Sequence, residues 1–330
     1  MTKIEAARTE YKDWCQAVGV DTLEKVNEAL EAGKAIELIN LCEARQERKY
    51  AQAADQIYWK RNRCRIVMMS GPSSSGKTSS SLRIAQQARV LGLKPKVIEL
   101  DNYFVNRENT PIDEHGERDY EALAAMDVAF LNQQLNDLLA GKEVELPKFD
   151  FKEGHRTFTG NTLRLEDGDI LFMEGIHALN PDLTPDIPRD RIFNIYISAL
   201  SALPGGEKDH GSTTDKRLLR RIVRDNRTRG ISPEDNILRW PSVRRGEIRN
   251  IFPYEENANI VFNSSTLYYI PLLKYYAEPL LCGISESSPA YAKAQSLLHF
   301  LENVRALKPS EIAAIPPTSI MREFIGGQTL

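Results

Sequence analysis

Short apolar runs recur along the chain, and each of them ends in polar residues. The first, RIVMMS at 65–70, leads into a loop rich in glycine and serine. Similar runs occupy 94–101, 169–175, 191–198 and 259–264. Continuous apolar runs of this length are typical of buried parallel strands. Helical periodicity separates several of them, notably at about 127–140 and 215–229. This alternation predicts an α/β fold, a mostly parallel sheet with helices on both faces.

Both ends of the chain show helical rather than strand periodicity. We predict a helical N-terminal extension at 1–62, a core at 63–283, and a C-terminal helical extension with a tail at 284–330. One helix is expected in 288–330, before the proline-marked IPPTSIMREFIGG. A further helix is predicted from SPED at 232–235 through Arg249, because Ser232 can cap it and Pro233 suits its first position.

The loop after the first strand carries a complete phosphate-binding pattern, G-x-x-x-x-G-K-[ST], with a strand before it and a helix after it. Backbone N–H groups of such a loop point at phosphate oxygens, its lysine reaches the β and γ phosphates, and its threonine hydroxyl can bind Mg²⁺. A serine-rich turn that matches by chance is the alternative, and both flanks argue against it. The predicted ATP-binding residues are Gly71, Ser73, Ser74, Ser75, Gly76, Lys77, Thr78 and Ser79.

Composition narrows the classes of protein that use such a loop. The net charge of −3 argues against bulk binding to nucleic acid, and no NKxD-type guanine reader is present, which argues against a GTPase switch. The start has no secretory pattern and no apolar run is long enough to span a membrane, so we expect a cytoplasmic protein. The four cysteines lie far apart, as expected of structural thiols rather than disulfides or a zinc site.

Two acids follow predicted strands, at the sheet edge where ligands of parallel sheets gather. Asp101 ends VIELD and could take the proton of an attacking hydroxyl. Glu174 ends LFMEG and could bind Mg²⁺. Each could instead belong to an ordinary turn.

The segment 215–230, DKRLLRRIVRDNRTRG, concentrates arginines in a chain of slightly negative charge. A lid at about 212–250 could bring some of them to the transferred phosphoryl group. The alternatives are a solvated helix or an RNA-binding patch. The apolar residues between the arginines indicate that one side of the helix is buried, so only some of the arginines should face a nucleotide.

Together these segments resemble the uridine kinase and phosphoribulokinase family of P-loop kinases, and in particular a bacterial uridine-kinase-like branch. The similar segments are GPSSSGKTS, LDNYF, LPKFDFKEGHR, MEGIHAL, DKRLLRRIVRDNRTRG and FPYEENANIVFNSS, in this order over about 65–265. The resemblance implies a P-loop NTPase fold, ATP and Mg²⁺ as cofactors, and a small-molecule acceptor. Homo-oligomers are frequent in the family, and the helical ends could serve as contacts.

The resemblance also implies roles for individual residues. Asp101 is the general base, with Lys77, Arg221 and Arg224 also catalytic. Arg224 and Arg229 contact ATP, and Mg²⁺ is held by Thr78, Glu174 and Asp101. The residues implied for the acceptor are Tyr103, Glu121, Phe149, Phe151, His155, Arg156 and Arg221.

The acceptor segment departs from uridine kinases in several positions. Their usual tyrosine, phenylalanine and histidine correspond to Phe149, Phe151 and Gly154, with His155 one place later. Glu121 stands where an aspartate usually holds the ribose hydroxyls, although it could simply be an acid at a helix start. The aromatics could stack on a base or serve as the core of a β-hairpin.

These features favour an ATP- and Mg²⁺-dependent kinase that acts on the 5′-OH of a nucleoside such as uridine or cytidine. One alternative is a kinase for another sugar, polyol or sugar phosphate, for which Arg244 and Arg245 could bind a phosphate already on the acceptor, although they could merely solvate a helix. The other alternative is a regulatory protein that binds ATP without catalysis.

Overall fold

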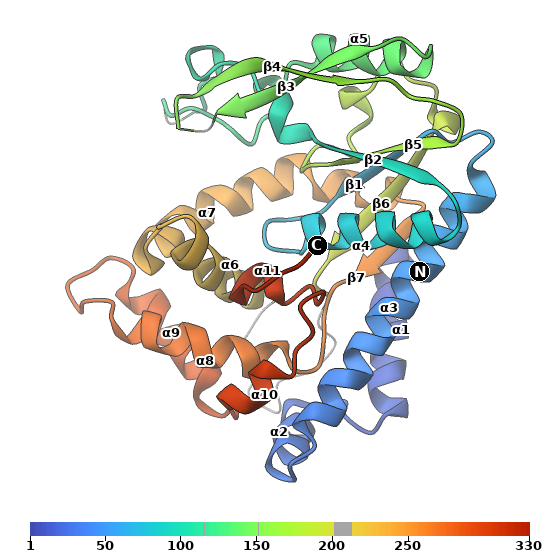
Figure 1. Cartoon of the computed structure of the whole chain (residues 1–330). Coiled ribbons are helices and arrows are strands. Elements are labelled where there is room, and N and C mark those ends of the chain that lie inside the picture. Colours follow the sequence, from blue (N-terminus) through green and yellow to red (C-terminus); the bar gives the residue numbers. More distant parts are fainter. Residues whose placement is uncertain (115, 151, 201–212) are drawn as a thin grey trace.

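A five-stranded sheet forms the centre of the computed structural model, which describes residues 1–114, 116–150, 152–200 and 213–330 (Figure 1). The strands are ordered β2-β5-β1-β6-β7, and all four pairings are parallel. This arrangement confirms the predicted α/β fold. The strands are β1 (Ile66–Ser70), β2 (Lys94–Glu99), β5 (Asp169–Glu174), β6 (Ile192–Ser198) and β7 (Ile260–Asn263).

Helices cover both faces of this sheet, and the strand residues alternate between two cores. Val67 and Met69 pack with α3 (Ala35–Lys60) and α4 (Lys77–Val90) on one face. Ile66 and Met68 point to the other face, where α5 (Val128–Leu139) packs. Because successive strand residues point to opposite faces and both faces are buried, the strand reads as a continuous apolar run.

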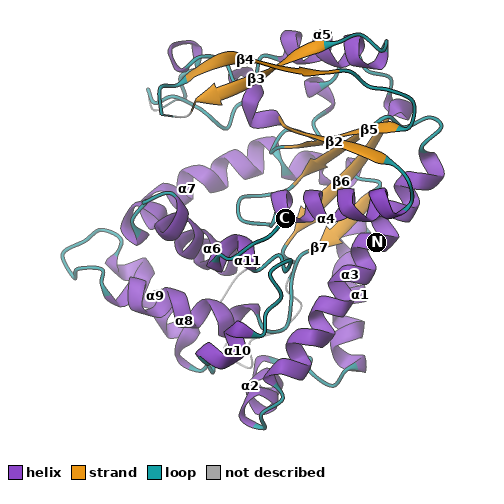
Figure 2. Ribbon diagram, viewed as in Figure 1, coloured by secondary structure: helices purple, strands orange, loops and turns teal. Residues whose placement is uncertain are grey.

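A third core joins the two ends of the chain to the arginine-rich segment. It contains residues of the first half of α3 and of eight further helices in the described part of the chain. These helices are α1 (Lys3–Ala17), α2 (Leu23–Glu31), α6 (Thr213–Thr228), α7 (Pro233–Asn250), α8 (Tyr269–Cys282), α9 (Tyr291–Glu302), α10 (Pro309–Ala313) and α11 (Arg322–Ile325). The terminal helices therefore share a core with α6 and α7 rather than standing apart as separate arms (Figure 2). Helices α8 and α11 contact α6, whereas α1 lies beside β7 and α2 beside α3.

The expected lid at about 212–250 corresponds to α6 and α7, although residue 212 lies outside the described residues. Helix α7 begins as the sequence predicts. Ser232 accepts a hydrogen bond from the Asp235 backbone N–H at 3.0 Å, and Pro233 is the first helical residue.

The structure corrects two local expectations. Residues 288–330 contain α9, α10 and α11 rather than one helix, because Pro309 and the pair Pro316–Pro317 interrupt the helical backbone. Strand β2 ends at Glu99, and Asp101 lies in the 3₁₀ turn Leu100–Tyr103 instead of ending the strand. Cys15, Cys42 and Cys64 are buried thiols as expected, but Cys282 is exposed.

A separate two-stranded hairpin, β3 (Val144–Asp150) and β4 (His155–Leu163), stands beside α5. It confirms the hairpin that the aromatic segment could form. Within the described residues, the structure contains no helix whose length and apolar character would allow it to cross a bilayer.

We predict that the N-terminal helices contribute directly to stability. Ile39 is fully buried in the third core, whereas Ile36, one turn earlier on α3, is 52% exposed. Ile39→Ala should lower the free energy of unfolding by about 2–5 kcal/mol, because it leaves a cavity. Ile36→Ala, the matched control, should change it by no more than about 0.5 kcal/mol. Urea unfolding followed by circular dichroism measures both, and equal effects would contradict the packing described here.

Candidate active site

A cavity of about 450 Å³ opens at the carboxyl ends of β1, β2 and β5. This is the edge at which open parallel sheets bind ligands. It gathers most of the predicted site residues from distant parts of the sequence. Those that line it are Ser73, Ser74, Ser75, Gly76, Lys77, Thr78, Asp101, Glu121, Phe149, Glu174, Arg221, Arg224 and Arg229.

The phosphate loop connects β1 to the first turn of α4. Gly76 precedes the helix with a φ of 86°, a left-handed conformation that favours glycine. The Lys77 ammonium turns back and donates to the Gly71 carbonyl at 2.9 Å and to the Pro72 carbonyl at 3.4 Å. These carbonyls hold the lysine at the mouth of the loop, where a phosphate oxygen could replace them as its partner.

Glu174 and Thr78 lie side by side across this loop. The Thr78 hydroxyl donates to the Glu174 carboxylate at 2.7 Å. Burial raises the pKa of Glu174 to about 7, and the positive charge of Lys77 opposes this rise. Removal from water by the surrounding protein also raises the pKa of Asp101. The Asp101 side chain faces the cavity.

These groups fit a magnesium ion. A hydroxyl and carboxylates are oxygen ligands, and Mg²⁺ in nucleotide sites takes one or two carboxylates and completes its shell with phosphates and water. Among the described residues, no cluster of three His, Cys, Asp or Glu side chains could hold a metal by itself. Thr78 and Glu174 would therefore share the ion with a nucleotide, and Asp101 lies in the same cavity.

Three arginines reach the cavity from α6 and the turn after it, and one buried carboxylate holds them. Asp225 has no exposed side-chain surface, and its oxygens lie 3.4 Å from Arg221, 2.7 Å from Arg224 and 3.5 Å from Arg229. Like charges this close repel, and Asp225 offsets that repulsion. The predicted division of the arginines is confirmed, because Arg220 points away and is buried against the C-terminal segment.

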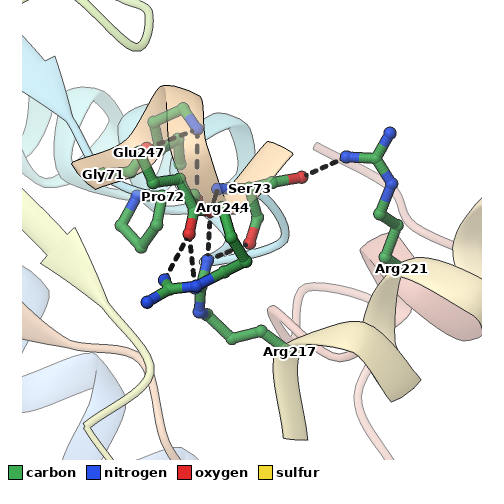
Figure 3. Close-up of polar contacts among 8 residues, drawn as sticks. Gly71, Pro72, Ser73, Arg217, Arg221, Arg244 and Glu247 are labelled. Atoms are coloured by element: carbon green, nitrogen blue, oxygen red, sulfur yellow. Dashed lines mark hydrogen bonds and ion pairs between the residues drawn. The ribbon is translucent and has the colours of Figure 1, made fainter. Parts of the chain in front are cut away.

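A second buried carboxylate connects α6, α7 and the phosphate loop (Figure 3). Glu247 accepts from the Ser73 backbone N–H at 2.9 Å, from Arg217 at 2.5 and 2.7 Å, and from Arg244 at 2.6 Å. Burial acts to raise the pKa of Glu247, but Arg217 and Arg244 hold it below its ordinary value. Arg221 donates to the Ser73 hydroxyl at 2.9 Å, so Ser73 is fixed from two sides.

Arg244 therefore makes an ion pair within the protein. Its guanidinium pairs with Glu247 and lies over the Phe252 ring, 5.1 Å from its centroid. Neither alternative drawn from the sequence describes it, because it neither faces a free anion nor merely solvates the helix. Arg245, the next residue, is exposed.

Three further residues that line the cavity, here called its far wall, are Glu121, Phe149 and Phe104. Helix α7 approaches Glu121 closely at Gly246, where an added Cβ would lie 2.7 Å from the Glu121 Cβ. Asn250 donates to the Glu121 carbonyl at 2.6 Å. Burial raises the pKa of the Glu121 carboxyl to about 7, and Arg221 opposes this rise.

Phe149 reaches the cavity because the hairpin is tied to the turn that carries Asp101. The Phe149 backbone N–H donates to the Asn102 side chain at 3.1 Å. Phe149 and Phe104 then meet edge to face, with ring centroids 5.9 Å apart. Two rings and a carboxylate thus line the same cavity.

Other residues predicted for the acceptor do not line the cavity. Tyr103 is buried, and its hydroxyl donates to Gln134 at 2.8 Å, which makes it a core residue. Arg156 pairs with Asp127 at 2.8 Å and lies over the Phe130 ring, so it joins the hairpin to α5. His155 is exposed at the start of β4. Phe151 lies outside the described residues.

Sequence reasoning missed several residues of the site. Asp225 had a readable signal, since it is four residues from both Arg221 and Arg229 and is therefore on their face of the helix. Glu247 had only its spacing of three residues from Arg244, because its partners Ser73 and Arg217 are far away in the sequence. Further residues that line the cavity are Phe104, Thr110, Tyr120, Ile176, Val243, Ile251 and Glu323.

The sequence is similar to those of known kinases. Residues 66–200 match the model of the phosphoribulokinase / uridine kinase family. A uridine kinase of Macrococcus caseolyticus is 31% identical over 198 residues, which cover 59% of this chain and 86% of the relative. One from Streptococcus equi subsp. zooepidemicus is 30% identical over 181 residues, 54% of this chain and 76% of the relative. A solved structure titled a possible uridine kinase from Bacillus stearothermophilus aligns with a TM-score of 0.40 at 19% identity, over 61% of this chain and 89% of that one. The chain belongs to the phosphoribulokinase/uridine kinase family.

Proposed function

We propose that this kinase transfers the γ-phosphoryl group of ATP to the 5′-OH of a nucleoside such as uridine or cytidine. The observation that carries the proposal is the position of Asp101 in the same cavity as the phosphate loop. A carboxylate with a raised pKa, placed beside Lys77 and the lid arginines, is suited to accept a proton from an attacking hydroxyl. A protein that only binds ATP has no need of such a base.

The site residues divide the work of phosphoryl transfer. The loop N–H groups and Lys77 bind the phosphates, while Arg221, Arg224 and Arg229 supply positive charge where it builds up on the transferred group. Mg²⁺, when bound by Thr78 and Glu174, neutralises charge on the phosphates. Asp101 orients the acceptor hydroxyl and takes its proton.

The far wall supports a nucleoside as the acceptor. The Glu121 carboxylate can accept hydrogen bonds from neighbouring ribose hydroxyls, and Phe104 and Phe149 offer aromatic surface to a base. The relatives reported above are named uridine kinases. A phosphorylated sugar is supported less well, because Arg244, a cation that it would need, is paired with Glu247.

ADP release from Mg-ATP, measured across nucleosides, free polyols and sugar phosphates, tests the proposal. Turnover with uridine or cytidine supports it. Turnover confined to phosphorylated sugars would replace it with a sugar-phosphate kinase, and tight ATP binding without turnover on any acceptor would leave a binding protein.

Asp101→Asn should lower kcat by about a hundredfold to ten-thousandfold, because the amide cannot take the proton. ATP affinity, measured by calorimetry without acceptor, should stay close to that of the unchanged protein. Near-normal turnover in the variant would remove Asp101 as the base.

The acceptor kcat/KM should rise with pH through about 7. Glu121 is largely protonated below this pH, and a protonated carboxyl is a weaker acceptor for ribose hydroxyls than a carboxylate. Glu121→Gln should lower kcat/KM and flatten this part of the pH profile. An unchanged profile in the variant would assign the pH dependence to another group.

Arg244→Gln should raise the KM for ATP by about fivefold, the effect of losing about 1 kcal/mol from the ion pair between the partly exposed Arg244 and the buried Glu247, which helps to hold Ser73 in place. Arg245→Gln is the matched control on the same helix and should leave the KM unchanged. If both variants behave alike, Glu247 does not need Arg244 to position the loop.

A further inference from the structure

The C-terminal segment 319–328 lies against the start of α4, beside the phosphate loop (Figure 1). The Ile320 side chain lies directly against Gly76: a Cβ added at Gly76 would be 2.4 Å from the Ile320 Cδ1. Glu323, from α11, lines the same cavity as Lys77 and Asp101. The segment is therefore part of the wall of the phosphate site.

The Glu323 carboxylate accepts two hydrogen bonds from Ser79. The Ser79 backbone N–H donates to Glu323 Oε2 at 3.3 Å, and the Ser79 hydroxyl donates to the same oxygen at 2.5 Å. Gln328 donates to the Ser79 hydroxyl at 2.7 Å. Both donors of Ser79 are thus directed at an anionic oxygen that the protein itself supplies.

These two donors lie next to the surface that a nucleotide would use, because Ser79 is itself fully buried and Glu323, which accepts from both donors, lines the cavity. Ser79 is the third residue of α4, and the first N–H groups of a helix have no partner within the helix. In a phosphate loop they bind phosphate oxygens, assisted by the helix dipole. A carboxylate at this place is an internal stand-in for a phosphate.

The segment is held in place by contacts outside the phosphate loop. Phe324 is fully buried, and the Arg220 guanidinium lies over its ring, 5.2 Å from the centroid. Arg220 also donates to the Ser264 carbonyl at 3.1 Å. Because Phe324 is anchored and Glu323 is only half-buried, the carboxylate can leave Ser79 by side-chain rotation without unfolding the segment.

We propose that Glu323 competes with the donor nucleotide, occupying the phosphate position of Ser79 until ATP takes its place. Glu323 and a nucleotide phosphate cannot both accept from the Ser79 N–H and hydroxyl, and their negative charges repel at that distance. ATP binding therefore includes the loss of these two hydrogen bonds. The inference rests on the nucleotide site of the proposed function but not on the identity of the acceptor.

The test measures Mg-ATP binding by calorimetry in the absence of acceptor, so that turnover plays no part. Glu323→Gln removes the charge but keeps the size of the side chain, and it should tighten binding by about tenfold, the value of one charge-assisted hydrogen bond. Glu286→Gln changes an exposed glutamate elsewhere in the C-terminal region and should leave the affinity unchanged. Weaker or unchanged binding by Glu323→Gln would overturn the proposal.

Hydrogen exchange gives a second readout on the unmodified chain. Amides of 319–328 should exchange no more slowly when Mg-ATP is added, because Glu323 leaves Ser79 by side-chain rotation while Phe324 stays anchored. Slower exchange would mean that the segment closes on the nucleotide, and would overturn the proposal. If the unmodified chain and Glu323→Gln both fail to bind Mg-ATP, the proposed function fails together with the inference, whereas equal and normal binding overturns the inference alone.

Discussion

Positive charge gathered at a phosphate site must be balanced when no phosphate is present, and this protein balances it with its own carboxylates. Asp225 holds Arg221, Arg224 and Arg229, which face the cavity from α6 and the turn after it, and Glu247 holds Arg217 and Arg244. Both carboxylates are buried, where an unpaired charge would be costly. Their pairing allows a dense basic cluster to exist in a chain of net charge −3.

The same pairing fixes geometry. Because Glu247 accepts from both a backbone N–H of the phosphate loop and two arginines, it ties the loop to helices α6 and α7. Gly246 and Asn250, its neighbours on α7, contact Glu121, which lines the same cavity. One short stretch of α7 therefore contacts both the phosphate loop and Glu121.

The parts of this site that sequence reasoning predicted are those with local patterns. The strands were visible because both faces of the sheet are buried, and the phosphate loop because its glycines and lysine must be close together in the chain. Tyr103 and Arg156 could not be placed, since whether a side chain enters the cavity or the core depends on how the hairpin and α5 dock. The role of Glu247 could not be predicted for the same reason, because Ser73 and Arg217 reach it only in the folded protein.

The burial of α6 has a consequence for the timing of turnover. Leu218, Leu219 and Ile222 are fully buried in the core that also contains the terminal helices. A helix anchored in this way cannot swing outward as a loose flap, so its arginines are ordered at folding rather than at each catalytic cycle. Nucleotide entry and exit then require side-chain rotations, which are far faster than movements of whole elements. The entropy of ordering the arginines is thus lost once per molecule, not once per reaction.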